Sequence, residues 1–306
     1  MNHKNFVFFD CECANTFEGV GKICSLGYVV CDDELNVLES EDVVMNPECE
    51  FDWYLFSGKG GCQLAYSKDF FRIKPNFAAY YKDIKKLFTT GNRFIAGFAV
   101  SNDVGFVNSA CERYNQNYIN FRAFDIEPLL HQIYGEKKKL KEWAEFLGVN
   151  VEKYMSHKSV DDAMMTMLCL KRVCQEQGKS VEELMKEHKG LFVSSEQMLI
   201  AQEERAYRRE VLEKIKRLYG KRSPKPRYKT LNGQQFEFNP KLLREVDLAF
   251  ELIKRIYEND GVVVESLKSK GTVIFLEKPD SPEFVEKMNK RGLEVTSVEE
   301  LEEKLR

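Results

Sequence analysis

The sequence predicts an α/β fold in which helices pack against a sheet, followed by a second, smaller α/β domain. Three observations lead to this prediction. Strand-like and helix-like patterns alternate along the first 178 residues, a Pro-containing stretch without apolar periodicity follows at residues 220–229, and a second alternation comes after it. With 306 residues, 43% of them hydrophobic, the chain has enough apolar material for two cores.

The composition argues against several classes of protein. The apolar run before Asp10 is too short for a signal peptide, and no later apolar stretch is long enough to span a bilayer. We therefore expect a cytoplasmic protein that does not bind membranes. The chain has nine Cys with no CxxC pair and no regular spacing, which favours reduced thiols over disulfides or a zinc site.

The first domain is expected to begin with strands and to continue with alternating helices. Apolar runs bounded by Gly, Asp or Asn-Pro predict strands at residues 6–11, 23–31, 41–45 and 93–98. A loop with the sequence "SGKGG" is expected at residues 57–61. Helical periodicity, with Gly148 and Gly178 as C-terminal stops, predicts helices at residues 76–88, 103–114, 140–147 and 160–174.

Two capping-box patterns, "SVEE" at Ser180 and "SSEQ" before a long helix at residues 195–219, follow the first domain. The long helix carries a narrow apolar stripe made of Leu212, Ile215, Leu218 and Tyr219. We place the domain boundary in the Pro-containing stretch after it. The predicted organisation is a first domain at residues 1–178, a basic helical linker at 179–229 and a small domain at 230–306.

The small domain is expected to alternate strands and helices around one modest core. Its predicted strands are residues 235–238, 261–265, 272–276 and 293–296. Its predicted helices, supported by Pro at two first turns and by a capping box at Ser297, are residues 240–257, 282–291 and 298–305.

Charge is distributed unevenly along the chain. Residues 205–229 hold eleven Lys or Arg against Glu210 and Glu213, a local charge of +9, so a net charge of -3 leaves -12 on the remainder. Two interpretations of this basic segment stay open, a solvated charged helix and a surface that contacts phosphate groups.

A pair of carboxylates ends the first predicted strand. Asp10 and Glu12 are two residues apart in "FVFFDCECAN", so on a strand they project from the same face. Like charges this close repel unless a cation lies between them, and hard oxygen ligands suit Mg²⁺ or Mn²⁺. The alternative is that the chain simply turns into solvent at Asp10.

Further acidic residues occur at two predicted helix starts. Asp103 opens one helix, where it could instead complement the helix dipole. In "HKSVDDA", His157 precedes Ser159, the expected N-cap, and Asp162 lies three residues into the helix. Asp162 could also be only the far partner of a capping box. Together with Asp10 and Glu12, these residues form an ordered signature.

Over residues 6–177 the chain resembles the DEDDh 3'-5' exonucleases, the group that contains the proofreading epsilon subunit of DNA polymerase III. The resemblance lies in this signature, in Asn46-Pro47 and in the stretches "FFDCECAN", "ICSLGYVV", "FDIEPLL" and "LKEWAEFLGV". It implies the ribonuclease H-like exonuclease fold, a mixed sheet flanked by helices. The spacing matches Asp162 rather than Asp161, and only one of these neighbours can face the site, because they project about 100° apart on a helix.

The resemblance also implies an activity. The chain would be a metal-dependent enzyme of DNA repair or replication that hydrolyses the terminal phosphodiester at the 3' end of DNA, or of RNA, to nucleoside 5'-monophosphates. Asp10, Glu12, Asp103 and Asp162 would hold two Mg²⁺ or Mn²⁺ ions. His157 would accept the proton of the attacking water. The expected partner is single-stranded or 3'-ended nucleic acid, with DNA favoured.

The chain departs from the family pattern near the expected substrate. Family members commonly carry an Asn four residues before the middle Asp and a Phe just before it, where this chain has Ala99 and Asn102. They commonly have Thr-Thr-Gly after the first two acids, where this chain has Cys-Ala-Asn. The alternative function is therefore a non-catalytic nucleic-acid-binding adaptor that keeps the nuclease fold. The residues expected to contact substrate are Cys13, Ala14, Phe98 and Asn102.

Residues 230–306 resemble a BRCT domain in the stretches "LNGQQFEF", "GTVIFLE" and "KRGLEVTSVEELEEKL". The resemblance implies a protein or phosphate ligand. Lys287 matches the phosphate-binding Lys of the second helix, whereas Asn239-Pro240 replaces the usual Thr-Gly. The expected phosphate contacts are Lys287 and Asn239, and the alternative for Lys287 is an ordinary solvated charge.

Overall fold

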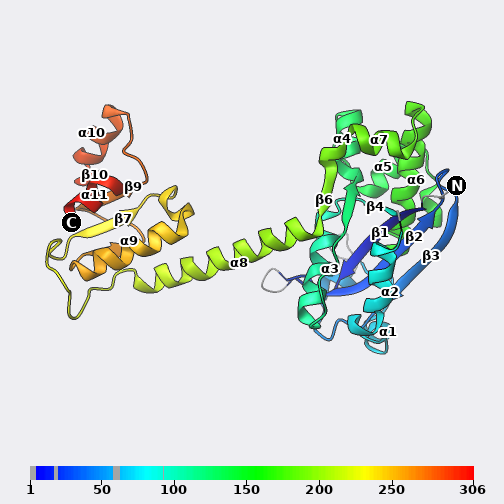
Figure 1. The fold of residues 1–306 in the computed structure, drawn as a ribbon, viewed down its shortest axis with the longest axis horizontal. Coiled ribbons are helices and arrows are strands. Elements are labelled where there is room, and N and C mark those ends of the chain that lie inside the picture. The colour runs from blue at the N-terminus through cyan, green and yellow to red at the C-terminus, as the bar shows by residue number, and fades with distance from the viewer. Residues whose placement is uncertain (1–4, 17–19, 58–62, 92) are drawn as a thin grey trace. The chain divides into compact units, whose positions relative to one another are not determined.

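The computed structural model describes residues 5–16, 20–57, 63–91 and 93–306 (Figure 1). The chain divides into two compact units, Met1–Ala201 and Gln202–Arg306. Residues 58–61 of the loop expected at 57–61 lie outside the described residues.

A mixed sheet forms the centre of the first unit. Over the described residues it has six strands in the order β3-β2-β1-β4-β5-β6. The β1–β2, β2–β3 and β5–β6 pairs are antiparallel, whereas β1–β4 and β4–β5 are parallel. The strands are β1 (Asn5–Cys13), β2 (Ile23–Cys31), β3 (Val37–Val44), β4 (Arg93–Gly97), β5 (Arg122–Asp125) and β6 (Phe192–Ser194).

Helices cover both faces of this sheet, because β1 alternates between two apolar clusters. Phe6 and Phe8 belong to the core beneath α4, α5, α6 and α7, and Val7 and Phe9 belong to the core beneath α2 and α3 (Figure 1). This arrangement confirms the predicted mixed sheet flanked by helices. The helices are α1 (Lys68–Arg72), α2 (Phe77–Thr89), α3 (Ser101–Arg113), α4 (Ile126–Tyr134), α5 (Leu140–Phe146), α6 (Ser159–Gln177) and α7 (Val181–Glu187).

The strongly patterned elements were predicted within a few residues, and short or polar ones were not. β3 begins at Val37 rather than at residue 41, because it is an edge strand whose first five residues are exposed and lack apolar alternation. Sequence periodicity did not identify β5, β6, α1 or α4. Strands of three or four residues, a helix of five residues and a helix with Pro128 in its first turn give little periodic signal.

The second unit contains a parallel sheet with the strand order β10-β9-β7-β8. Its helices are the C-terminal part of α8 (Ser195–Leu218), α9 (Val246–Glu258), α10 (Pro282–Lys290) and α11 (Val298–Lys304). Its strands are β7 (Gln235–Phe238), β8 (Val262–Val264), β9 (Gly271–Phe275) and β10 (Leu293–Ser297).

The prediction of one helix over residues 240–257 was wrong. A 3-10 turn at Leu242–Arg244 precedes α9, and the chain leaves helical geometry at Glu245, whose ψ is 70°. The Asn239 side chain accepts the Lys241 N–H at 2.9 Å, which closes a tight turn and buries Leu242.

The boundaries of the structural units differ from the predicted domain boundaries. Residues 179–229 do not form a separate linker, because α7 buries Val181, Leu184 and Met185 in the core of the first unit. In the second unit, α8 buries Val211 and Ile215. The stripe predicted on the long helix is therefore core-forming, and the division falls between residues 201 and 202.

The described cysteines are free thiols, and most of them are buried as small apolar side chains. None of the helices in the described ranges is long and apolar enough to cross a membrane.

Candidate active site

The end of β1 places Asp10 and Glu12 on the face of the sheet that α6 covers. Asp10 pairs with Gly27 of β2, and Glu12 pairs with Ser25. Their side chains share the face of Phe6 and Phe8, because side chains alternate along a strand. Both acids are only partly exposed.

The N-terminus of α6 lies directly on β2 next to these acids. Gly27 permits this approach, because a Cβ there would lie 1.9 Å from the backbone nitrogen of Val160. The Ser25 and Ser159 hydroxyls meet at 2.5 Å in the same contact. Ser159 is therefore a buried first residue of the helix that packs against β2, and its predicted role as the N-cap was wrong.

His157 precedes α6 in a left-handed backbone conformation with φ of 62°. Its backbone N–H donates to Asp162 Oδ2 at 2.8 Å, and the Nδ1 atom of its imidazole ring lies 3.2 Å from Glu12 Oε1. One ligand atom from each of Glu12, His157 and Asp162 lies within 4.8 Å of the other two. The loop before α6 therefore connects the β1 acids to the helix acid.

Asp103 joins this region from the first turn of α3. Asp103 is 5% exposed, and its carboxylate accepts the backbone N–H of Cys11 at 2.9 Å. This bond ties α3 to the residue between Asp10 and Glu12. Asp103 thus reaches the end of β1 and also lies where a carboxylate complements the helix dipole.

Burial and neighbouring negative charges raise the pKa values of Asp10, Asp103 and Asp162. Burial raises the pKa of Asp10 well above its usual range, and the negative charges of Asp103, Asp162 and Glu12 raise it further. Burial and the charge of Glu12 raise the pKa of Asp103, although the Cys11 N–H opposes this shift. The pKa of Asp162 rises to about 7, chiefly through burial, against the effect of the His157 N–H.

Three contacts bring the four carboxyl groups to one region: Asp10 and Glu12 share a face of β1, Asp103 is bonded to the intervening Cys11, and Asp162 lies near Glu12. Within the described part of the chain, Asp10 and Asp103 are outside the group whose ligand atoms lie within 4.8 Å. Hard oxygen donors crowded in this way suit a divalent cation, which would remove their repulsion. The residues present therefore fit a site for divalent cations.

The two neighbouring acids of α6 have different surroundings. Asp162 is in the cluster, whereas Asp161 accepts the N–H of Met155 at 2.9 Å and pairs with Lys158 at 3.2 Å. Asp161 therefore stabilises the turn before the helix, and of the two neighbours it is Asp162 that belongs to the cluster.

The residues expected to contact substrate have different environments. Cys13 is partly exposed, Asn102 is exposed, and Phe98 packs partly buried against the core. Ala14 contradicts the expectation, because it is fully buried, its N–H donates to Lys22 and its carbonyl accepts from Asp52. Ala14 therefore has no free group for a substrate.

Sequence reasoning missed Asp42. It pairs with Gly27, which pairs with Asp10, so all three lie in one row across the sheet. The Tyr66 hydroxyl donates to Asp42 Oδ2 at 2.8 Å, whereas Oδ1 is buried without a hydrogen-bond partner in the described structure, and burial raises the pKa of this carboxyl. The acid at the start of the predicted strand 41–45 was a weak signal, because its position depends on strand register.

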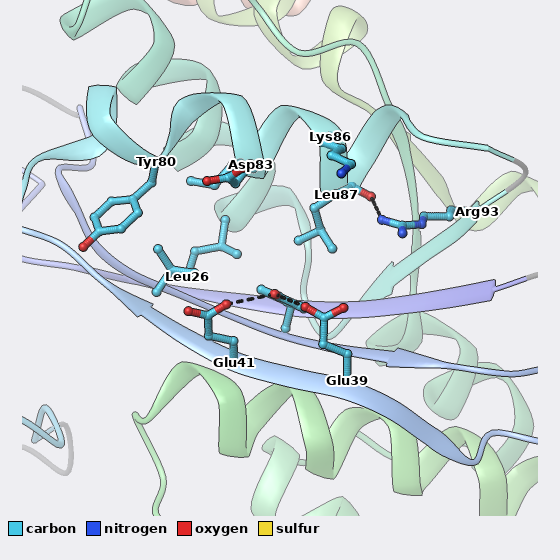
Figure 2. A pocket seen from close by; sticks show the side chains of 11 residues that line it. Leu26, Glu39, Glu41, Tyr80, Asp83, Lys86, Leu87 and Arg93 are labelled. Carbon is cyan, nitrogen blue, oxygen red and sulfur yellow. Dashed lines mark hydrogen bonds between the residues drawn. The ribbon is translucent and has the colours of Figure 1, made fainter.

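A cavity of about 410 Å³ lies on the opposite face of the sheet, between β3 and α2 (Figure 2). The Tyr28 hydroxyl lies 2.6 Å from Glu39 and 3.0 Å from Glu41, and Asp83 and Arg93 also line the cavity. No predicted catalytic residue is among its lining residues. The sheet separates it from the acidic cluster.

In the second unit, Asn239 lines a cavity of about 560 Å³ at the C-terminal ends of β7 and β9, together with Lys241, Lys278 and Phe284. Lys287 lies on an exposed part of α10 and is not among the residues that line this cavity. The structure therefore does not bring the two expected phosphate contacts to one cavity.

Two solved structures are similar to part of this chain. The structure of E. coli exonuclease I in complex with a dT13 oligonucleotide aligns with a TM-score of 0.48 and 18% identity, over 57% of this chain and 42% of that one. A zinc-bound E. coli exonuclease I complex with single-stranded DNA aligns with a TM-score of 0.49 and 18% identity, over 58% of this chain and 42% of that one. This chain thus spans less than half the length of those structures. A search of curated proteins gave no match.

A family model covers the residues that build the cluster. The RNase_T model, described as "Exonuclease", matches residues 7–170, more than half of the chain. The matched range includes β1 from Val7 onward, all of α3 and α6 up to Leu170, and so all the acids of the cluster and His157. The chain belongs to this exonuclease family.

Proposed function

We propose that the protein is a divalent-metal-dependent 3'-5' exonuclease that removes nucleoside 5'-monophosphates from single-stranded or 3'-ended DNA. The observation that carries this proposal is the group of Glu12, His157 and Asp162, whose ligand atoms lie within 4.8 Å of one another. Asp10 lies on the same face of β1 as Glu12, and Asp103 of α3 accepts the N–H of the residue between them, so acids from three separate elements meet beside His157. Mg²⁺ or Mn²⁺ is the proposed cofactor, held as two ions by the acids.

Each residue has a role that follows from its position. Bound divalent cations would supply charge neutralisation at the scissile phosphate and lower the pKa of the attacking water. Asp10, Glu12, Asp103 and Asp162 would hold these cations in place. His157, whose side chain is 35% exposed, is the residue that accepts the proton from the attacking water. The hydrogen bond from the His157 backbone N–H to the Asp162 carboxylate keeps the imidazole beside the cluster.

The experiment follows cleavage of single-stranded DNA labelled at either end. Wild-type protein with Mg²⁺ or Mn²⁺ should release labelled mononucleotide at once from a 3' label and give a shortening ladder from a 5' label. Asp10→Asn and Asp162→Asn should each lower kcat by at least about a thousandfold, the loss of several kcal/mol of charge stabilisation. His157→Ala should lose about a hundredfold or more and retain measurable activity.

Asp161→Asn is the matched control, because Asp161 neighbours Asp162 on α6 and lies outside the cluster. It should retain most of the activity. Cleavage that persists in chelator, or an Asp162→Asn variant as active as the control, would overturn the proposal. Binding of DNA without any cleavage would instead identify the chain as an adaptor. Parallel digestion of RNA decides the choice of nucleic acid.

We also propose that residues 230–306 form a BRCT-like module with a protein or phosphate ligand. The parallel β10-β9-β7-β8 sheet and its helices follow the order of elements expected from the sequence, which supports this proposal. The cavity beside Asn239 lies at the C-terminal ends of parallel strands, where ligands of open α/β sheets bind. Isothermal titration with a phosphopeptide and its unphosphorylated twin tests it, and equal binding of both would contradict a phosphate ligand.

A further inference from the structure

A basic segment of the second unit, residues 217–229, begins with the last two residues of α8 and continues toward β7 (Figure 1). We call this segment the basic strap. No Asp or Glu occurs in it. Its cationic residues are Arg217, Lys221, Arg222, Lys225, Arg227 and Lys229.

Backbone hydrogen bonds hold the basic strap in place. The Gly220 N–H donates to the Val263 carbonyl at 2.8 Å, and the Tyr228 N–H donates to the Glu258 carbonyl at 3.0 Å. Pro224 and Pro226 restrict the backbone between these two anchors. The strap is therefore a fixed surface feature of the second unit.

Most of the positive charge of the basic strap is unbalanced. Arg222 is the exception, because its guanidinium donates to both Asp260 oxygens at 2.7 Å, and the Asp260 side chain is only 5% exposed. This pair anchors the strap and neutralises the buried acid. The remaining cationic residues are exposed and form no ion pair within the described ranges: Arg217, Lys221, Lys225, Arg227 and Lys229.

The preceding part of α8 is different. Lys214 pairs with Glu210 at 2.7 Å, and Lys216 pairs with Glu213 at 3.0 Å. Both acids of the segment at 205–229 are thus used within the helix. The strap holds six of the eleven cationic residues of this segment and no acid, so it is a run of positive charge that a polyanion would bind.

An aromatic ring lies among the cations. Tyr228 is 51% exposed, and the Arg227 guanidinium lies 5.4 Å from the centroid of its ring. Cationic side chains interleaved with an exposed aromatic ring suit single-stranded nucleic acid, because the cations contact phosphates and the ring stacks on a base. An anionic membrane or an acidic peptide would use the charge but would gain no base stacking.

We propose that the basic strap is a second nucleic-acid site, which binds the backbone of a single strand through its unpaired cations and stacks a base on Tyr228. The choice of ligand rests on the proposed function, whose substrate is such a strand. The strap contributes no group to the acidic cluster, so it changes substrate affinity and leaves the hydrolytic step to the first unit.

The test measures binding by the full-length protein without cleavage. Fluorescence anisotropy follows a labelled oligothymidine of about 30 nucleotides in chelator over a range of salt concentrations. The triple variant Lys225→Gln, Arg227→Gln, Lys229→Gln should bind at least about tenfold more weakly at low salt. The slope of log affinity against log salt concentration should become less negative by about two, because each of the three lost phosphate contacts contributes about 0.7 to the slope on a single strand.

Two control variants separate the strap from general charge. Neutralising three exposed lysines elsewhere in the second unit, Lys268→Gln, Lys290→Gln and Lys304→Gln, should leave the affinity within about twofold. Exchanging the strap cations, Lys225→Arg, Arg227→Lys and Lys229→Arg, should restore binding, which shows that charge rather than folding is responsible. Tyr228→Ala should weaken binding about five- to tenfold, whereas Tyr228→Phe should not.

Equal losses of affinity for the oligonucleotide in the strap variant and in the lysine control would overturn the proposal. So would a strap variant that loses binding to phosphatidylserine vesicles or polyglutamate while its affinity for the oligonucleotide is unchanged. The proposed function can fail independently, because cleavage is scored with metal and binding in chelator. If the wild type never cleaves DNA but the strap variant still loses binding, only the nuclease proposal falls.

Discussion

A buried acid outside the cluster shows how individual residues position the site. Asp125 accepts the N–H groups of Ala99 at 3.0 Å, Val100 at 3.2 Å and Glu127 at 3.1 Å. These bonds fix the turn that leads from β4 into α3, which carries Asp103. They favour the ionised carboxyl, but burial is the larger effect and raises the pKa of Asp125 to about 6.

Asp125 should therefore make stability depend on pH. Because its folded pKa of about 6 exceeds the ordinary aspartate value of 3.8, the native state binds the proton more tightly, and this contribution to stability is lost as pH rises through about 6. Between about pH 5 and about pH 7.5 the free energy of unfolding should fall by about 1 kcal/mol through this group. Urea denaturation with saturating Mg²⁺ measures it. The Asp125→Asn variant should lack this component, and an unchanged slope in that variant would contradict the assignment.

At the scale of elements, the contact between α6 and β2 sets the position of His157 and Asp162. Gly27 lies between Asp10 and Asp42 across the sheet and has backbone of α6 directly over it. The obstacle to a larger residue is main chain, which cannot move aside by changing a rotamer. The cluster therefore depends on a residue that carries no functional group.

Gly27→Ala should displace the N-terminus of α6. The added Cβ would lie 1.9 Å from Val160 N, so the helix must shift, at a cost of about 1–3 kcal/mol in unfolding free energy. A shift of about 1 Å should lower kcat/KM by about a hundredfold. Gly190→Ala is the control, because nothing lies within 4 Å of its added Cβ. Wild-type kinetics in Gly27→Ala would show that the contact does not position the site.

At the scale of the whole molecule, the two units should respond differently to divalent cations, because the acidic cluster lies entirely in the first. Mg²⁺ or Mn²⁺ at about a hundred times its Kd should stabilise the first unit by about 2.7 kcal/mol. Scanning calorimetry should show a higher Tm for that unit and no change for the second. Asp10→Asn should raise the Tm without metal, by removing a repelling charge, and should abolish the response to metal. A metal-induced shift retained in Asp10→Asn would contradict the proposed ligands.

The amino-acid sequence by itself determined the elements with strong local patterns and the acids that could form a site. Strands such as β2 and helices such as α2 have periodicity that depends only on neighbouring residues, so their positions were predicted within one or two residues. The order of Asp10, Glu12, Asp103, His157 and Asp162 along the chain was likewise visible without coordinates.

Tertiary structure decided the features that depend on contacts between distant residues. The register of β1, β2 and β3 brings Asp42 and Gly27 into line with Asp10, and packing removes Ala14 from the surface. The cores assign α7 to the first unit and the end of α8 to the second. Local periodicity does not predict these features. Strand register and burial are set by which apolar surfaces pack against one another and exclude water, and those surfaces come from residues far apart in the chain.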